Sequence, residues 1–567
     1  MKEQLKEQVS GSQALVHTLK LQSVSNLFGL IGSDLISVFD ELRGTPEIRT
    51  IQARHEASAA NMANGYARIT GKFAVCLVHN GPGLTNALTG LAVAYRSFSP
   101  LILISGAATT LQRYRDAIQE LDQLSLTRPI TKWSGSVTKL ERIPEMLNLA
   151  IKIATEARTG PVHLDIPRDL LVQKGEVEVQ ATPARTQQRT VVSDPSIIVS
   201  VASLLSSAQR PIIIAGGGVV ASDATDELTE LSEMLTIPVA TSYGHLDAFP
   251  SDHPLMLGGL GRDGSKVARK FVKESDVILA LGTRLSAFTT FFSHEYISRE
   301  ARIIQVELEA GEVGRHFPVE IGIIADAKAF TQSLLQYLKE TTKNKFIPNS
   351  TRFKHVSEAK ITYQAELSES YSFDAFPIKP QAVFKVLNDV LKHDDIVVLD
   401  DGNAVAYAYH LLKFNKPRTF LSPLDLACIG SAYPTALGAK IARPKNQVFA
   451  VCGDGGFSMT ISELATAVQY GIDVKAIVLN NNCWAAEKAY QKYQYGGRYF
   501  GCDLQNPSFA EVAEKFGVTG VRVEKSSDLK PALTSLLDLE KPSLLEVMVD
   551  PDELLPPARA DLTGKNL

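Results

Sequence analysis

The chain has little cysteine: five residues in 567, and no two of them form a CxxC pair. Scattered cysteines of this kind argue against a zinc site or a disulfide framework and fit a reducing compartment. The sequence also has no apolar run long enough to span a membrane, and its first residues lack the apolar core of a secretory signal. We therefore expect a cytoplasmic protein without a membrane partner.

A strong charge of one sign is missing as well. The formal net charge is -4 at pH 7 and the pI is about 6.3, and no long basic stripe is present. Because sequence-independent binding to nucleic acid depends on clustered positive charge, we expect no nucleic-acid partner. Hydrophobic residues make up 45% of the chain, and this content at this length predicts a globular protein of several domains.

Short apolar runs alternate with segments of helical spacing along the chain, which predicts an α/β fold with parallel sheets. A polar stretch (residues 176–194) and a charged stretch (residues 339–369) interrupt this alternation. We therefore place three doubly wound, parallel-sheet domains at residues 1–175, 190–340 and 375–550.

A glycine-rich turn, residues 215–218, follows an apolar strand-like run in the central domain. Dinucleotide-binding sites contain such turns, but this one is weaker than GxGxxG and has no acidic ribose partner at the usual distance. We favour a structural role for the central domain and keep a bound nucleotide as the alternative.

Asp454 and Asn481 form the most informative pattern in the chain. Residues 449–452 and 475–479 have the composition of buried strands, and residues 462–470 have the spacing of a helix between them. Both polar residues thus follow neighbouring parallel strands, where α/β sheets bind their ligands. Carboxylate and amide oxygens suit Mg²⁺, which usually completes its octahedron with phosphate oxygens and water. The pair predicts a metal and a phosphate-bearing ligand.

Three glycines, Gly453, Gly455 and Gly456, surround Asp454. Glycine lets a backbone approach a phosphate closely, and unpaired amides at the start of a helix favour an anion. The plain alternative is a tight turn at residues 453–456 and an ordinary strand end at residues 480–481. The presence of both motifs at this spacing favours a ligand site.

This arrangement resembles the signature of thiamine-diphosphate enzymes, and the resemblance covers nearly the whole chain. It implies thiamine diphosphate as the cofactor, held through Mg²⁺ by Asp454, Asn481 and the backbone carbonyl of Cys483. Residues 54–68 resemble the helix whose glutamate contacts the aminopyrimidine ring in this family. Glu56 is the matching residue, although taken alone it would be an ordinary exposed carboxylate.

The resemblance also implies how the cofactor is held and shared. A bulky aliphatic residue, here Ile429, supports its bent shape in this family, although residues 424–440 would also suit a plain core helix. The family's sites lie between subunits, so we expect a homodimer or homotetramer in which Glu56 faces Asp454 of the partner subunit. The full set of implied cofactor-binding residues is Glu56, Pro82, Asn86, Gly402, Asn403, Ala427, Ile429, Gly453, Asp454, Gly455, Gly456 and Asn481.

The reaction within this family is less sharply indicated. Residues 116–132 resemble acetohydroxyacid synthases, whereas residues 243–254 and 258–266 resemble sulfoacetaldehyde acetyltransferases more. The second resemblance implies that sulfoacetaldehyde and phosphate give acetyl phosphate and sulfite, through an acyl or enamine intermediate on the coenzyme. Because the flavin-contacting motifs of the synthases are not matched at residues 258–266 and 281–288, we do not expect FAD.

Two alternatives remain for the function. The first is a 2-oxo acid decarboxylase or carboligase of the acetolactate synthase type. The expected small-molecule substrate is therefore an aldehyde together with phosphate in the acetyltransferase reading, or a 2-oxo acid in this one. The second is a non-catalytic regulatory subunit with the same fold. Retention of Glu56, Ile429, Asp454 and Asn481 together argues against the second, since a decayed site should lose at least one of them.

The remaining candidates would handle protons and substrate. His79 and Gln119 are expected beside Glu56 as catalytic residues, with His79 as a proton carrier near neutral pH. A sulfonate or phosphate requires cationic or amide donors, which work best where water is excluded. The substrate candidates are Asn80, Trp484, Lys488 and Arg498. The alternatives are an ordinary loop position for His79 and solvated surface charges for Lys488 and Arg498.

Overall fold

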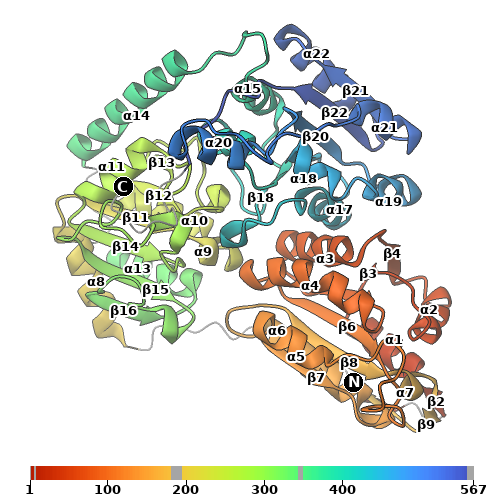
Figure 1. The fold of residues 1–567 in the computed structure, drawn as a ribbon. Coiled ribbons are helices and arrows are strands. Elements are labelled where there is room, and N and C mark those ends of the chain that lie inside the picture. Colours follow the sequence, from red (N-terminus) through yellow and green to blue (C-terminus); the bar gives the residue numbers. More distant parts are fainter. Residues whose placement is uncertain (1, 5–7, 181–193, 343–348, 558–567) are drawn as a thin grey trace.

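The computed structural model describes residues 2–4, 8–180, 194–342 and 349–557. Within these ranges, three six-stranded sheets are each flanked by helices (Figure 1). Every strand pair inside the three sheets is parallel. The predicted fold class, three doubly wound α/β units, is confirmed.

The N-terminal sheet has the strand order β4-β3-β5-β6-β8-β7. The connections run in opposite directions from β3, so a crevice opens at the carboxyl ends of β3 and β5. The strands are β3 (Asn26–Gly29), β4 (Arg49–Gln52), β5 (Ala74–Val78), β6 (Leu101–Ala107), β7 (Trp133–Ser136) and β8 (Val162–Pro167). The helices are α1 (Gly11–Leu21), α2 (Ile36–Arg43), α3 (Glu56–Thr70), α4 (Pro82–Arg96), α5 (Gln123–Thr127), α6 (Ile143–Thr155) and α7 (Arg168–Val172).

The C-terminal sheet repeats the same topology in the order β18-β17-β19-β20-β22-β21, with its crevice at the ends of β17 and β19. The strands are β17 (Ile396–Leu399), β18 (Phe420–Leu421), β19 (Val448–Gly453), β20 (Lys475–Asn480), β21 (Thr519–Val523) and β22 (Ser543–Met548). The helices are α15 (Pro380–Val390), α16 (Ala408–Leu411), α17 (Ala432–Ala442), α18 (Asp454–Ser458), α19 (Glu463–Tyr470), α20 (Ala485–Gln494), α21 (Phe509–Lys515) and α22 (Ser526–Leu537).

The central sheet has a different order, β13-β12-β11-β14-β15-β16, which is that of dinucleotide-binding folds. The strands are β11 (Pro211–Ala215), β12 (Val239–Thr241), β13 (Met256–Gly259), β14 (Val277–Leu281), β15 (Arg302–Glu307) and β16 (Ile321–Ile324). The helices are α8 (Pro195–Ser207), α9 (Gly217–Ala221), α10 (Thr225–Leu235), α11 (Lys266–Glu274), α12 (Ala287–Thr290) and α13 (Ala327–Thr342), and α14 (Ser350–Ser370) leads to the C-terminal sheet.

Each six-stranded sheet lies within one of the three predicted ranges, but the N-terminal unit extends past residue 175. Its core includes Val177 and Val179, and β10 (Glu178–Gln180) pairs with β1 (Lys2–Gln4). A second short pair joins β2 (Val9–Ser10) to β9 (Lys174–Gly175). The predicted polar connection therefore begins as structured chain, and residues 181–193 lie outside the described residues.

Helices α3 and α17 pack the N-terminal and C-terminal units against each other (Figure 1). A Cβ atom added at Gly65 would lie 2.1 Å from the carbonyl oxygen of Thr435, and one at Gly438 would lie 1.9 Å from that of Met62. Only glycine permits backbones to approach so closely. The two units share one hydrophobic core across this contact, so their relative position is fixed by direct packing.

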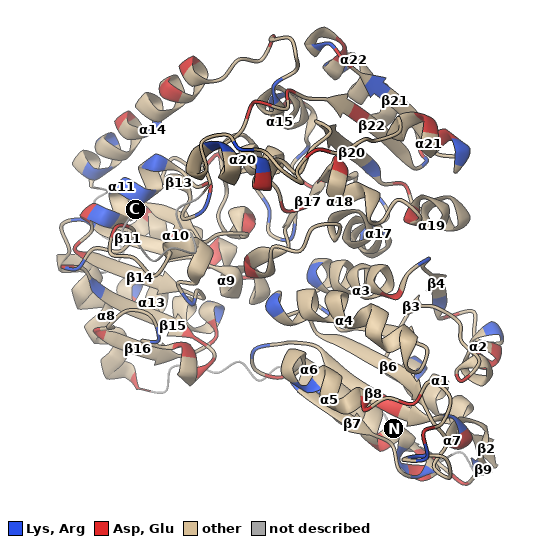
Figure 2. Cartoon of the chain, in the orientation of Figure 1, with Lys and Arg blue, Asp and Glu red and all other residues tan. Residues whose placement is uncertain are grey.

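Charged residues of both signs are interspersed over all three units (Figure 2). No described helix is both long and apolar enough to cross a membrane.

Candidate active site

The predicted metal residues meet at the C-terminal crevice. Asp454 directly follows β19, and the amide nitrogen of Gly455 donates to its Oδ1 at 3.0 Å. Asn481 follows the neighbouring strand β20, and both side chains are buried. Burial raises the pKa of Asp454 to about 6, although the hydrogen bonds from Gly455 and Asn506 oppose this shift. A buried carboxylate without a cationic partner is costly, and a divalent cation would offset that cost.

Asn506 is a residue of this site that the sequence did not reveal. Its Nδ2 donates to Asp454 Oδ2 at 2.8 Å and to Asn480 Oδ1 at 3.3 Å, so it connects the ends of β19 and β20. It lies in an irregular segment before α21, where no pattern distinguishes one asparagine from another. Only the fold shows that this side chain is near Asp454.

Cys483 is buried beside these residues. Its amide nitrogen donates to Asn481 Oδ1 at 3.3 Å, and the residue forms an isolated antiparallel bridge with Asp503. Burial raises the pKa of the Cys483 thiol to about 12, so the side chain stays a thiol at neutral pH. This fits the predicted use of its backbone carbonyl, which needs no thiol chemistry.

The glycines around Asp454 are required by close packing. A Cβ atom at Gly455 would lie 2.3 Å from the Trp484 ring, and one at Gly456 would lie 2.2 Å from Asp400 Oδ2. A Cβ atom at Gly453 would meet nothing within 4 Å, so space is open on that side. Trp484 therefore packs against the glycine turn after β19, and its role beside the substrate stays a prediction.

Asp400 is a second residue that the sequence did not reveal. It follows β17, and its Oδ2 accepts a hydrogen bond from the Gly430 amide at 2.8 Å. Its Oδ1 is buried and has no hydrogen-bond partner among the described residues. Burial raises the pKa of Asp400 to about 7, despite the hydrogen bonds from Gly430 and its neighbours. An unpaired buried acceptor at this position is free to bind a ligand donor.

At the same crevice Leu424–Leu426 form a short 3-10 turn, residues 427–430 are irregular, and α17 begins only at Ala432. Leu424, Ala427 and Gly430 all have positive φ angles, of 52°, 53° and 78°. The core-helix alternative therefore holds for α17 but not for the residues before it. Ile429 is half-buried within this segment, in the region predicted to support the cofactor.

The second group of predicted residues lies at the N-terminal crevice. Glu56 is the first residue of α3, and its Oε2 accepts a hydrogen bond from Asn86 Nδ2 at 2.9 Å. Pro82 is the first residue of α4, where its fixed φ suits the start of a helix. A Cβ atom at Gly83 would lie 2.9 Å from His79 Cβ and at an ordinary contact distance, 3.4 Å, from Glu56 Oε1, so both residues lie close to the start of α4.

His79 is held between Asp34 and Gln119. Its Nδ1 contacts Asp34 Oδ1, and its Nε2 lies 2.8 Å from Gln119 Oε1. Asp34 Oδ2 also accepts a hydrogen bond from the Asn80 amide at 2.9 Å. The structure thus brings together His79, Gln119 and Asn80 and adds Asp34, whose position after β3 carried no recognisable motif.

Sequence profiles match all three units of the chain. The N-terminal thiamine pyrophosphate (TPP) binding domain matches residues 9–126, the central TPP enzyme domain residues 198–334, and the C-terminal TPP binding domain residues 400–547. The chain belongs to the thiamine pyrophosphate enzyme family. The predicted resemblance to thiamine-diphosphate enzymes is confirmed.

Three relatives of this thiamine pyrophosphate enzyme align over nearly its whole length. A probable acetolactate synthase large subunit of Methanocaldococcus jannaschii is 36% identical, with 97% of this chain and 93% of the relative covered. A probable acetolactate synthase large subunit of Methanococcus aeolicus is 33% identical (98% and 95% covered). A sulfoacetaldehyde acetyltransferase of Alcaligenes xylosoxydans xylosoxydans is 34% identical (98% and 95% covered). These relatives identify a catalytic, thiamine-diphosphate-dependent enzyme and set aside the non-catalytic alternative.

The donor set at Asp454 fits the metal expected in a thiamine pyrophosphate enzyme. Asp454, Asn481 and the Cys483 carbonyl offer only oxygen atoms, which suit a hard cation such as Mg²⁺. Among the described residues, no cluster of three His, Cys, Asp or Glu side chains offers a site for a softer metal. The oxygen donors of Asp454, Asn481 and Cys483 therefore fit a bound Mg²⁺.

The other predicted residues are less directly placed. Lys488 is a buried residue of α20, and its Nζ lies 3.3 Å from Asp552 Oδ1. Arg498 is exposed on the turn after α20. The Asn403 side chain is hydrogen-bonded to the backbone of Leu555 at 2.8 and 2.9 Å, so it holds the C-terminal segment.

Glu56 and His79 belong to the N-terminal unit, whereas Asp454 and Asn481 belong to the C-terminal unit. No hydrogen bond or ion pair in the described ranges joins the first two residues to the second two. The polar contacts between the units lie elsewhere, such as the Arg54 amide to Glu463 Oε1 at 3.0 Å. The faces that carry these residues are partly exposed: Pro82 and Asn86 are exposed on α4, and Met459 is 57% exposed near the glycines.

Proposed function

We propose that this enzyme binds thiamine diphosphate through Mg²⁺ and uses it in a sulfoacetaldehyde acetyltransferase type of reaction. The observation that carries the cofactor proposal is the pairing of Asp454 and Asn481 at adjacent strand ends, beside the open space at Gly453. Asp454, Asn481 and the Cys483 carbonyl would hold the metal. Glycine amides at residues 453–456 would hold the diphosphate.

The coenzyme, when bound, supplies a nucleophilic carbon and accepts the electrons of a broken bond to carbon. Glu56 would hold a proton at the pyrimidine ring nitrogen, and Asn86 orients its carboxylate through the 2.9 Å hydrogen bond. Ile429 would support the cofactor's bent shape, next to the left-handed turn at Ala427.

His79 would move protons to and from the substrate in this site. Asp34 fixes the imidazole through Nδ1, and Gln119 contacts Nε2, so the ring has one orientation. General acid–base groups must be positioned before they are effective. The buried Lys488 lies close to the loop that carries Asn481 and Cys483. Its positive charge would favour the binding of a sulfonate or phosphate group.

The substrate would be sulfoacetaldehyde, from which the carbon–sulfur bond is broken to release sulfite, and phosphate would accept the acetyl group. Relatives of comparable identity carry the name acetolactate synthase, which supports a second candidate. In that reaction a 2-oxo acid loses carbon dioxide and the remaining fragment is joined to a second carbonyl. The proposal includes no flavin, because the sequence departs from the synthases' flavin-contacting motifs at residues 258–266 and 281–288.

The site is proposed to form between two copies of the chain, in a homodimer or a dimer of dimers. Two observations support this: no hydrogen bond or ion pair among the described residues connects the Glu56 and Asp454 groups within one chain, and each group leaves an exposed face. In such a dimer the Glu56 face of one copy would lie against the Asp454 face of the other, and this contact would exclude water from the cofactor.

A substrate panel tests this proposal. Purified protein with Mg²⁺ and thiamine diphosphate is incubated with sulfoacetaldehyde plus phosphate, and separately with pyruvate. Sulfite and acetyl phosphate in equal amounts are expected in the first reaction. Release of carbon dioxide from pyruvate, without sulfite in the first reaction, would transfer the assignment to the acetolactate synthase type. A thermal melt that coenzyme and Mg²⁺ do not change would contradict both.

A further inference from the structure

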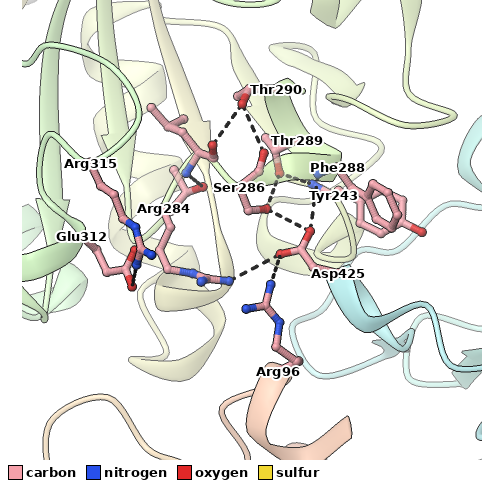
Figure 3. Close-up of polar contacts among 12 residues, drawn as sticks. Arg96, Tyr243, Arg284, Ser286, Phe288, Thr289, Thr290, Glu312, Arg315 and Asp425 are labelled. Carbon is pink, nitrogen blue, oxygen red and sulfur yellow. Dashed lines mark hydrogen bonds and ion pairs between the residues drawn. The ribbon is translucent and has the colours of Figure 1, made fainter. Parts of the chain in front are cut away.

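A junction of charged side chains joins all three units at one point. Asp425 lies in the C-terminal unit, Arg96 ends α4 of the N-terminal unit, and Arg284 follows β14 of the central unit (Figure 3). The Nη2 atoms of Arg96 and Arg284 lie 3.6 and 3.4 Å from Asp425 Oδ2. One carboxylate therefore faces a guanidinium from each of the other two units.

The second oxygen of Asp425 is also occupied. The Ser286 hydroxyl donates to Oδ1 at 3.2 Å, and the Phe288 amide donates to it at 3.4 Å (Figure 3). The Asp425 side chain is 9% exposed. A carboxylate with this burial needs cationic and hydrogen-bonding partners, and here all of them come from other units of the chain.

Arg284 is itself fixed. Its guanidinium carbon lies 4.5 Å from the centre of the Phe98 ring, which belongs to the N-terminal unit. On the same ring, Arg158 lies at 4.7 Å and pairs with Glu312 at 2.9 Å. Contacts within the protein thus hold the partners of Asp425 in place without a ligand.

Asp425 belongs to the segment 424–430, which contains the predicted cofactor-binding residues Ala427 and Ile429. Leu424 and Ala427 have left-handed backbone angles, which L-residues adopt at a cost. Leu424 also packs directly on the central unit, because a Cβ atom at Gly244 would lie 2.1 Å from its Cδ2. Within this segment only Leu424–Leu426 form a short 3-10 turn, closed by the Ala427 amide on the Leu424 carbonyl at 3.1 Å, so residues 427–430 depend on contacts with other parts of the chain.

We infer that Asp425 is a positioning residue that sets the conformation of segment 424–430 for coenzyme binding, with Arg96 and Arg284 as its fixed anchors. This inference rests on the proposed thiamine-diphosphate site. Asp425 does not need to touch the coenzyme. Asp425 lies two residues before Ala427 and four residues before Ile429. Its contacts hold the backbone of this segment, which would otherwise relax from its left-handed turns.

The test compares Asp425→Asn with Glu312→Gln in the full-length protein. Both changes turn a carboxylate of the same junction into an amide, and the side chains are similarly buried, at 9% and 7% exposed. Glu312 pairs with Arg158 and Arg315, and no hydrogen bond or ion pair among the described residues joins it to segment 424–430. Hydrogen exchange of residues 424–430 is measured without coenzyme, and the dissociation constant of thiamine diphosphate is measured with Mg²⁺.

Asp425→Asn is expected to speed hydrogen exchange in residues 424–430 and to weaken coenzyme binding about tenfold, since affinity scales with the fraction in the binding conformation. Turnover at saturating coenzyme should stay within about twofold, because the reacting groups are unchanged. Glu312→Gln should lower the melting temperature but change exchange in the segment and coenzyme affinity less than Asp425→Asn does, since Glu312 acts on the segment through Arg284 and not by a bond of its own. Equal effects of the two variants on exchange and affinity would overturn the inference.

Two further outcomes are separable. If the wild-type protein binds no coenzyme, the proposed function fails, and the exchange measurement alone decides whether Asp425 orders the segment. If Asp425→Asn does not fold, Ser286→Ala removes only the hydroxyl donor to Asp425. That variant should raise exchange in residues 424–430 to a smaller degree, and no change would count against the inference.

Discussion

Asp34 binds His79 through one carboxylate oxygen and the amide of the next residue, Asn80, through the other. The carboxylate therefore fixes both the imidazole ring and the loop that carries it. A Cβ atom at Gly106 would lie 1.6 Å from Asp34 Oδ2, so β6 supports the carboxylate from behind. His79 is presented to Gln119 and to the crevice in one orientation.

Asp34→Asn should lower kcat about 100-fold, because a positioned acid–base group contributes on this order and the amide cannot stabilise the charged imidazole. Coenzyme affinity should stay unchanged, since Asp34 lies away from the Asp454 group. Steady-state kinetics and a coenzyme titration check both. Asp40→Asn, on exposed α2, is the control, and equal kcat values for the two variants would contradict a role of Asp34 in proton transfer.

Glu56→Gln should leave thiamine diphosphate bound while suppressing turnover about 1,000-fold, within the range expected when an acid–base group is lost. The amide keeps the size of the side chain and its contact with Asn86. Isothermal titration and single-turnover assays separate binding from chemistry. An unchanged rate would show that Glu56 does not activate the coenzyme.

Asp454→Ala should abolish the Mg²⁺-dependent part of coenzyme binding. The carboxylate is the only formally charged metal donor in the predicted set, so its loss removes the charge that attracts the cation. Asp503→Ala, at an exposed position beside the same loop, is the control. A melting temperature that rises equally with Mg²⁺ and coenzyme in both variants would place the metal elsewhere.

The pairing of strands with the motifs that follow them could be predicted from sequence because both depend on local patterns. The buried run before Asp454 and the buried run before Asn481 became adjacent parallel strands, as expected. Glu56 was predicted from the resemblance of residues 54–68 to the family's glutamate helix. It is the third residue of that segment and the first residue of α3.

Asp34, Asp400, Asn506 and Asp425 could not be predicted in the same way. Each acts through a partner from another part of the chain, such as Asp454 for Asn506 and Arg284 for Asp425. No spacing rule connects residues that meet only after the strands of one sheet, or for Asp425 all three units, have packed together. The exposed position of Arg498 and the bond from Asn403 to Leu555 were likewise set by tertiary contacts.

Asp165 should make stability depend on pH. Burial raises its pKa to about 7 from an ordinary value of 3.8, although Arg113 and Gln123 oppose the shift. The folded protein therefore binds this proton more tightly, and the stability gained from it is present at acidic pH and lost as pH rises through about 7. Asp165→Asn cannot ionise and should lose less melting temperature than wild type between pH 5 and pH 8. Parallel pH profiles would contradict this.

A mixing experiment decides whether the site is shared between subunits. Glu56→Gln and Asp454→Ala homodimers should each be inactive, and chains of the two variants are denatured together and refolded. In a mixed dimer with shared sites, one site carries both changes and the other carries neither, so activity of about one quarter of wild type is expected after random assortment. If each chain held its own complete site, every site would carry one change and the mixture would stay inactive. Refolded single variants, which should show no recovery, exclude activity that arises from refolding alone.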